Sequence, residues 1–188
     1  MIYEVADLDE WRIADALDFC VAPGTAAEHV ESQRADSEQW LRQVLNEWKP
    51  CGKIGYVEGK ADGLLLYLPR ALATGRSLCA NYSCNPVEYP KSWGERDIVV
   101  IVCLRVEGKG LGLGGALLGS MLDEMAHGRE FGRAACREIG VMVYSPEDTI
   151  HWPAGPTEFY RSFGFHVEET DTDGKRIWLT RPLHLPSY

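Results

Sequence analysis

A buried-strand pattern runs directly into a glycine-rich segment and then into a helical pattern, and this succession constrains the fold more than any other feature. The run DIVVIVCLRV, from Asp97 to Val106, is largely apolar and β-branched, which is typical of a strand buried on both faces. Five glycines follow within residues 108–115. Apolar residues then recur at helical spacing, at Leu117, Leu118, Met121, Leu122 and Met125. The unit predicts a strand, a loop whose backbone comes close to another group, and a helix.

The start of that helix is an expected binding site for an anion. Backbone N–H groups in a first helical turn have no intrahelical partner and carry the positive end of the helix dipole, which suits phosphate. A Walker A loop is excluded, because Ala116 and Leu117 stand where that motif needs Lys and Ser or Thr. A dinucleotide fingerprint fits Gly110, Gly112 and Gly115, but no glycine follows the strand directly. A dinucleotide-dependent oxidoreductase therefore remains only the third alternative.

Two motifs carry a resemblance to a known family. The segment KGLGLGGALL resembles the pyrophosphate-binding pattern of the GNAT N-acetyltransferases, in which Arg or Gln precedes Gly by three residues and Gly or Ala by five. Lys109 takes the first place and keeps a positive charge, and Gly112 and Gly114 take the other two. The later segment FYRSFGF resembles the family's Tyr-x-x-x-Gly-Phe, with Tyr160 and Gly164 in its places. Their order along the chain also agrees with the family.

The resemblance implies an α/β fold with a mixed, mostly antiparallel sheet, flanked by helices and with two central parallel strands that splay apart. The patterns themselves predict the order β-α-α-β-β-β-α-β-α-β-β, in one domain spanning residues 1–188. A capping box at Asp36 and Gln39 predicts the start of the second helix. Gly59 and Gly63 predict the turn of the first hairpin.

The resemblance also implies acetyl-coenzyme A as the co-substrate, without a metal. The residues that it assigns to cofactor binding are Cys103, Leu104, Val106, Lys109, Gly110, Leu111, Gly112, Leu113, Gly114 and Gly115. Among them, the backbone N–H of Leu104 would polarise the acetyl carbonyl. Tyr160 would donate a proton to the leaving sulfur as general acid.

The general base is less well defined by the sequence. Many family members carry an acidic residue on the strand before the glycine loop, whereas the segment IVVIVC has none. Asp97 is the candidate base, and Glu95 is its alternative. A chain of water molecules, or an amine deprotonated in solution, would also serve. The family often has Asn seven residues before the tyrosine, where this chain has Pro153.

The predicted reaction is transfer of an acetyl group to a primary amine by direct attack in a ternary complex. A small-molecule acceptor is expected, with a protein lysine or N-terminus as the alternative. A non-catalytic acyl-coenzyme A-binding module is the second hypothesis for the function. The long irregular segment 69–95 carries Tyr82, Tyr89 and Trp93 and is predicted to help shape the acceptor site.

Composition excludes several other classes. The net charge of −9 argues against a nucleic-acid partner, since phosphate backbones need a basic face. No segment is long and apolar enough for a membrane partner, and the N-terminus lacks a signal-peptide pattern, so we expect a cytoplasmic protein. The six cysteines form no CxxC pair, which favours reduced, buried thiols over a metal site. A homodimer is one assembly that the sequence allows.

Overall fold

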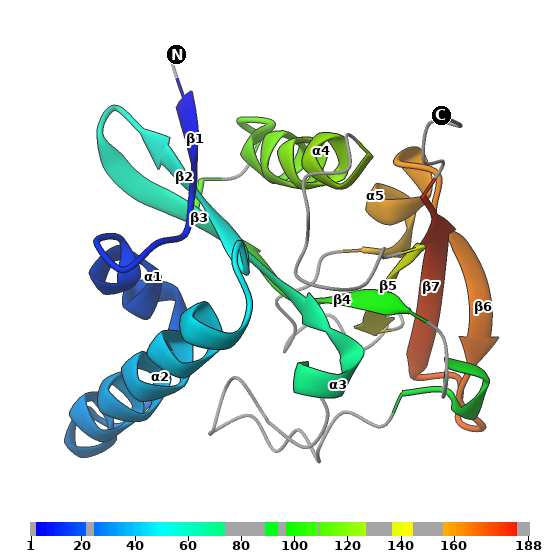
Figure 1. The fold of residues 1–188 in the computed structure, drawn as a ribbon, viewed down its shortest axis with the longest axis horizontal. Helices are drawn as coiled ribbons and strands as arrows, with labels where there is room; N and C mark the ends of the chain where they lie inside the picture. The colour runs from blue at the N-terminus through cyan, green and yellow to red at the C-terminus, as the bar shows by residue number, and fades with distance from the viewer. Residues whose placement is uncertain are drawn as a thin grey trace.

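The computed structural model describes residues 3–21, 25–73, 89–93, 97–108, 110–126, 137–144 and 156–183. One seven-stranded sheet runs through them in the order β1-β2-β3-β4-β5-β7-β6 (Figure 1). Its strands are β1 (Tyr3–Asp7), β2 (Gly52–Val57), β3 (Lys60–Pro69), β4 (Ile98–Val106), β5 (Glu138–Tyr144), β6 (His166–Thr170) and β7 (Arg176–Pro182). Strands β4 and β5 are parallel, and all the other paired neighbours are antiparallel. The predicted mixed, mostly antiparallel sheet is confirmed.

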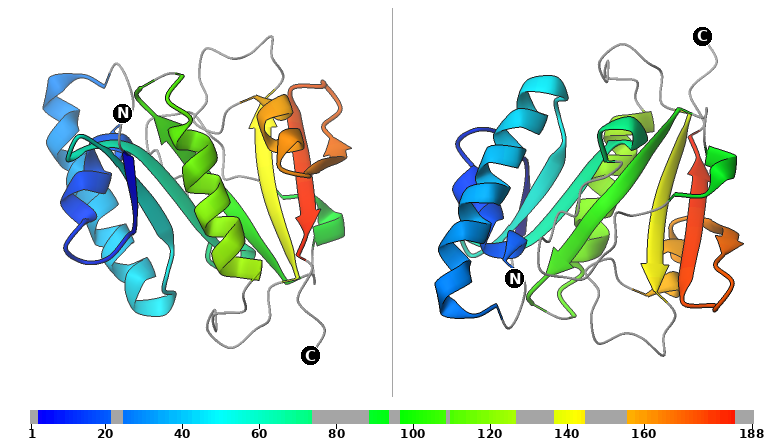
Figure 2. Two further views of the ribbon diagram at one scale, coloured as in Figure 1. Left: turned by 90° about the horizontal axis from the view of Figure 1, so that it is seen from above. Right: turned by 90° about the horizontal axis from the view of Figure 1, so that it is seen from below.

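Helices cover both faces of the sheet (Figures 1 and 2). One face carries α4 (Leu113–Ala126) and α5 (Thr157–Ser162). The opposite face carries α1 (Ile13–Cys20) and α2 (Ala27–Glu47), and a short α3 (Arg70–Ala73) follows β3. The 3-10 helix η1 (Lys91–Trp93) precedes β4. No helix in the described part of the chain has the length and apolar character needed to cross a membrane.

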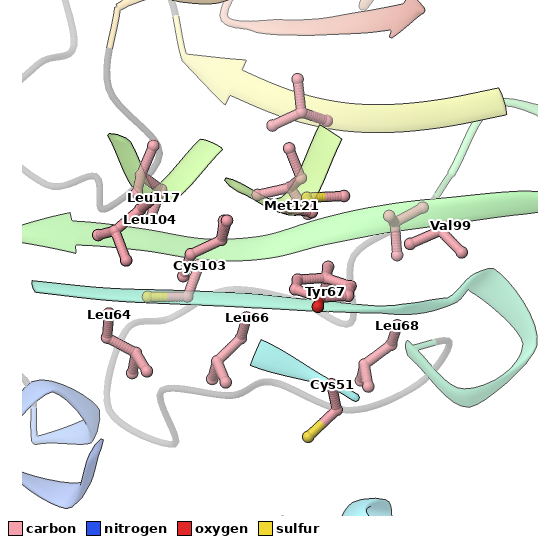
Figure 3. Close-up of a cluster of buried hydrophobic side chains, with 14 of the residues drawn as sticks. Cys51, Leu64, Leu66, Tyr67, Leu68, Val99, Cys103, Leu104, Leu117 and Met121 are labelled. Carbon is pink, nitrogen blue, oxygen red and sulfur yellow. The ribbon is translucent and has the colours of Figure 1, made fainter. Parts of the chain in front are cut away.

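Strand β3 shows why the core has two layers. Its side chains from Leu64 to Leu68 are all buried, since each face of the strand packs against helices. Leu64, Leu66 and Leu68 project to one side of the strand, away from Met121 of α4 (Figure 3). The apolar stripe that the sequence placed on α4 is wholly buried as well. A strand that is buried on both faces has a nearly continuous apolar sequence, which is why β3 and β4 were recognisable in the sequence.

An ion cluster around the buried Lys53, with the buried Glu124 and the exposed Asp7, fastens α4 to the first strands. The ammonium of Lys53 on β2 pairs with the carboxylates of Asp7 on β1 and Glu124 on α4. The Tyr67 hydroxyl on β3 donates to the same Glu124 carboxylate at 3.5 Å. Removing one partner of such a pair leaves an uncompensated buried charge, which is strongly destabilising. The cluster therefore helps to hold the end of α4 in place over the sheet.

Two local predictions were wrong. Helix α2 begins at Ala27, nine residues before the capping box, and Asp36 lies exposed within it. The preceding residues carry a weak apolar stripe, but Ala, Glu, Gln and Arg are strong helix formers and extend the helix. The hairpin turn consists of Glu58 and Gly59, both with positive φ, whereas Gly63 lies within β3.

Candidate functional site

Strands β4 and β5 separate halfway along their length. They pair only from Ile98 to Ile101 on β4 and from Glu138 to Val141 on β5. Beyond that point β5 keeps only its partner β7, and β4 keeps only its partner β3. Figure 2 shows the two strands meeting at one end and diverging toward the other. The backbone groups of β4 that face β5 after Ile101 therefore have no strand partner among the described residues, as the resemblance implied.

A β-bulge lies where the two strands part. Leu66 of β3 is opposite Cys103 and Tyr67 is opposite Ile101, so Val102 has no residue opposite it. An extra residue in one strand bends that strand and increases its twist. The bulge therefore turns the second half of β4 away from β5.

Cys103, Leu104 and Val106 lie on this second half of β4. Cys103 and Leu104 are buried, and Val106 is partly buried opposite Gly63 of β3. Leu104 is opposite Leu65, so its pairing to β3 leaves the other edge of β4 open toward the splay. The three residues therefore reach the splayed end, where the sequence had placed them.

The glycine loop follows β4 and turns the chain into α4. Gly110 and Gly112 have φ angles of +82° and +73°, which side-chain-bearing residues rarely adopt. The Gly112 carbonyl accepts the first helical hydrogen bond, from Ala116 N–H at 3.0 Å. The N–H groups of the first turn, at Leu113, Gly114 and Gly115, therefore have no partner within the helix. Lys109 lies outside the described residues, and Leu111 is partly buried within the turn.

Two glycines on the sheet determine where α4 begins. Gly55 of β2 and Gly63 of β3 are directly opposite each other. A Cβ at Gly55 would lie 2.6 Å from Leu113 Cδ1, and a Cβ at Gly63 would lie 3.0 Å from Leu117 Cδ1. The first turn of α4 thus packs directly on the backbone of β2 and β3, at two positions that have no side chain. Sequence reasoning missed this role, because nothing local in the sequence marks a helix that packs over a strand glycine.

Tyr160 on α5 is completely buried, with 0% of its surface exposed. Its ring packs edge-to-face with Phe159, at 5.1 Å between centroids, and with Phe165, at 5.5 Å. The hydroxyl has no hydrogen-bond partner among the described residues. Burial raises the pKa of the phenol well above its ordinary value, and the neighbouring Cys103 raises that pKa further. Tyr160 is therefore a protonated donor close to β4.

Helix α5 also contacts the start of α4. A Cβ at Gly114 would lie 3.8 Å from Phe159 Cζ, and a Cβ at Gly115 would lie 3.5 Å from Phe163 Cζ. The second motif thus packs on the first turn that follows the glycine loop. The arrangement combines an open strand edge, a cluster of N–H groups without a partner inside α4, and a buried phenol. It fits a ligand that carries an anionic group at one end and a polarisable carbonyl at the other.

The structure does not bring Asp97 to this site. Asp97 is exposed and precedes the first residue of β4, whereas Leu104 lies near the last. Seven residues of extended strand separate the two positions by roughly 23 Å, at about 3.3 Å per residue. The geometry therefore disfavours Asp97 as the base, and Glu95 falls outside the described residues.

Trp93 also differs from its predicted place. Its ring is completely buried, and a Cβ at Gly140 of β5 would lie 2.5 Å from its Cη2 atom. Tyr89 stacks on it at 5.8 Å between ring centroids. Trp93 therefore forms part of the core beneath β5, and Tyr82 lies outside the described residues.

Two charged residues near the site had no signal in the sequence. Arg105 of β4 donates to the carbonyls of Phe19 and Val21 at 3.1 and 3.0 Å, which fastens the end of α1 beside the splayed strand. Asp62 of β3 accepts a hydrogen bond from the first glycine of the loop. Both contacts join residues at least 46 positions apart, and only the tertiary structure brings them together.

The described cysteines are buried, as the sequence predicted. Cys20, Cys51 and Cys103 are buried, and Cys79, Cys84 and Cys136 lie outside the described residues. Burial raises the pKa of the Cys51 thiol to about 12, so this cysteine is unreactive. Within the described ranges, no three His, Cys, Asp or Glu side chains gather as a metal site would require.

Comparison with known proteins establishes the fold. No family model matches the sequence, and no curated protein matches it significantly. Solved structures do match along nearly the whole chain. The ribosomal-protein-S18-alanine N-acetyltransferase from Escherichia coli is 15% identical with a TM-score of 0.57, over 99% of this chain and 97% of that one. A ribosomal-protein-alanine N-acetyltransferase from Brucella melitensis is 18% identical with a TM-score of 0.58, over 96% and 99%.

A third similar structure contains a ligand. The PaiA N-acetyltransferase from Thermoplasma acidophilum, solved in complex with coenzyme A, is 12% identical with a TM-score of 0.55, over 97% of this chain and 99% of that one. At these identities the likeness shows a common fold. The chain therefore has the fold of the GNAT N-acetyltransferases, as the two sequence motifs predicted.

Proposed function

We propose that this chain, which has the GNAT fold, is an acetyl-coenzyme A-dependent N-acetyltransferase that acts on a primary amine. The observation that carries the proposal is the meeting of three features at the splayed strands. The open edge of β4, the unpartnered N–H groups that begin α4 and the buried phenol of Tyr160 are joined by the contact of Phe159 with Gly114. Acetyl-coenzyme A would supply the activated acetyl group.

The residues of the chain fit this co-substrate in three ways. The N–H groups of Leu113, Gly114 and Gly115 would bind the diphosphate at the positive end of α4. The free edge of β4 near Leu104 would bind the amide arm and orient the acetyl carbonyl toward a backbone donor. Tyr160 holds a proton at Oη, and its raised pKa keeps that proton in place until it is donated to the leaving sulfur.

No carboxylate lies on β4 between Ile98 and Val106, so the strand itself supplies no base. We propose that the acceptor amine loses its proton to water before it attacks. The rate should then rise with pH as more of the amine becomes neutral. Asp97 remains a weaker candidate because of its distance along the strand.

We propose a small-molecule amine as the acceptor. A polypeptide N-terminus is the second candidate, because similar solved structures include two ribosomal-protein-alanine N-acetyltransferases. The chemistry is the same for both, namely attack of a neutral primary amine on the acetyl carbonyl. The two classes of acceptor differ in the groups that surround the amine, and therefore in the protein surface that would have to bind them.

The test is an acceptor panel with acetyl-coenzyme A, in which release of the free thiol is measured. One arm contains small amines and the other contains short peptides with free N-termini, including one that begins with alanine. Turnover in either arm supports the enzyme and identifies the acceptor class. Binding of coenzyme A without turnover across both arms would instead indicate a non-catalytic acyl-coenzyme A-binding module.

A further inference from the structure

We infer that Asp62 is a positioning residue for the cofactor site, and this inference rests on the proposed function. Asp62 lies on β3, one residue before the point where β3 and β4 begin to pair. Its backbone carbonyl accepts a hydrogen bond from Glu107 N–H at 2.9 Å. Its side-chain Oδ2 accepts one from Gly108 N–H at 3.0 Å. One residue thus holds two consecutive amides at the point where the chain leaves β4.

The first glycine of the loop is explained by this contact. A Cβ at Gly108 would lie 2.5 Å from Asp62 Oδ2 and 2.8 Å from Leu111 Cδ1, distances that real Cβ atoms do not adopt, and the nearer of the two groups is the carboxylate. Gly108 lies before the segment that resembles the GNAT pattern, so the resemblance assigns it no role. The group that its backbone approaches is a carboxylate of the same chain. The glycines that remain for a ligand are those from Gly110 onward.

The contact also determines which donors remain for a diphosphate. Because Asp62 uses the N–H of Gly108, the available groups are those of the loop after it and of the first turn of α4. Gly63, the next residue, packs against Leu113 and Leu117 of α4. Adjacent residues of β3 therefore position both the start of the loop and the start of the helix.

Loss of the carboxylate should therefore loosen the loop and weaken cofactor binding without altering the chemical step. We expect Asp62→Ala to raise the Kd of coenzyme A and the KM of acetyl-coenzyme A about tenfold, the size of effect expected for one hydrogen bond to a charged group. The acceptor KM and kcat should stay within about threefold. Asp62→Asn retains an acceptor oxygen, so it should restore affinity to within about threefold of wild type.

Gly108→Ala gives an independent perturbation and completes a double-mutant cycle. The added methyl should push the carboxylate away and raise the Kd of coenzyme A at least as much as Asp62→Ala does. In the Asp62→Ala background the carboxylate is gone and only the contact with Leu111 Cδ1, at 2.8 Å, remains, so the same substitution should have a clearly smaller further effect. Glu31→Ala removes an exposed carboxylate from α2 and serves as the matched control, with an unchanged Kd.

The measurements are isothermal titration with coenzyme A, steady-state kinetics, and hydrogen exchange of the peptide that contains residues 107–112. The inference predicts faster exchange of that peptide in Asp62→Ala and wild-type exchange in Asp62→Asn. A tight wild-type complex with an unchanged Kd in Asp62→Ala and Gly108→Ala would overturn the role of Asp62 alone. A wild-type protein that does not bind coenzyme A would overturn the proposed function, and this inference with it.

Discussion

Phe159 lies against Gly114, where an added Cβ would be 3.8 Å from the ring. The two residues belong to motifs that are about forty-five positions apart in the sequence, one that begins α4 and one that forms α5. Their contact places the N-terminal end of α4, the proposed diphosphate site, beside the helix that carries Tyr160. The distance between the proposed diphosphate donors and the phenol is thereby set by side-chain packing, and small changes at this junction should affect the proposed catalysis.

Replacing Tyr160 with Phe should make the protein more stable and less active. The hydroxyl is buried without a partner among the described residues, so its removal should raise the free energy of unfolding by about 1 kcal/mol. The loss of the proton donor should lower kcat by roughly 10²–10⁴, with near-normal coenzyme A affinity. Denaturant unfolding and steady-state kinetics measure the two effects. A variant with wild-type kcat, where chemistry limits turnover, would reduce Tyr160 to a packing residue.

Stability should decrease steeply in alkaline solution. Burial raises the pKa of Tyr67, Tyr89 and Tyr160 above the value near 10 of an unfolded tyrosine. The unfolded chain therefore loses protons first as the pH rises above 10, and the folded state loses stability by about 1.4 kcal/mol per pH unit for each such tyrosine. Below pH 10 both states keep the proton, and the contribution is constant. Denaturant titrations between pH 8 and 11 test this. In Tyr160→Phe the free energy of unfolding should fall less steeply with pH, by the contribution of one tyrosine.

Substitutions at Gly112 can separate the effect of side-chain charge on coenzyme A binding from the effect of side-chain shape. Its φ of +73° strains any side chain, although Asn and Asp adopt this region more readily than other residues. Gly112→Asp should abolish binding of coenzyme A, because its carboxylate would face the diphosphate. Gly112→Asn has the same shape without the charge and should retain substantially more affinity. Equal Kd values for the two variants, measured in folded protein, would place the diphosphate elsewhere.

The position of α4 should depend on Gly55. Gly55→Ala would force a methyl to 2.6 Å from Leu113 Cδ1, which should cost about 1–3 kcal/mol of unfolding free energy and weaken coenzyme A binding. Gly119→Ala is the matched control within α4, because a Cβ there meets nothing within 4 Å. It should stabilise the protein by up to about 1 kcal/mol, since Ala replaces Gly inside a helix. Similar stability changes in both variants would contradict the close packing of α4 on β2.

Local sequence patterns determined much of the secondary structure around the glycine loop and Tyr160. The apolar run at β4, the glycines after it and the stripe on α4 predicted a strand, a loop and a helix, because each signal depends on neighbours within a few residues. The positive φ angles of Gly110 and Gly112 agree with that loop. The motif around Tyr160 likewise predicted a short helix, and α5 is that helix.

Contacts between distant residues were decided only by the tertiary structure. The nearest neighbour of a Cβ at Gly108 would be Asp62, and that of a Cβ at Gly55 would be Leu113, each more than forty positions away. Asp97 and Leu104 belong to one largely apolar run in the sequence, yet Asp97 precedes β4 and Leu104 lies near the other end of that strand. Spacing along a chain reports periodicity but not which surfaces meet, since burial and close approach depend on how the sheet and helices pack. The sequence therefore predicted the strand, the loop and the helix that carry the proposed site, whereas packing decided which residues hold these elements in place.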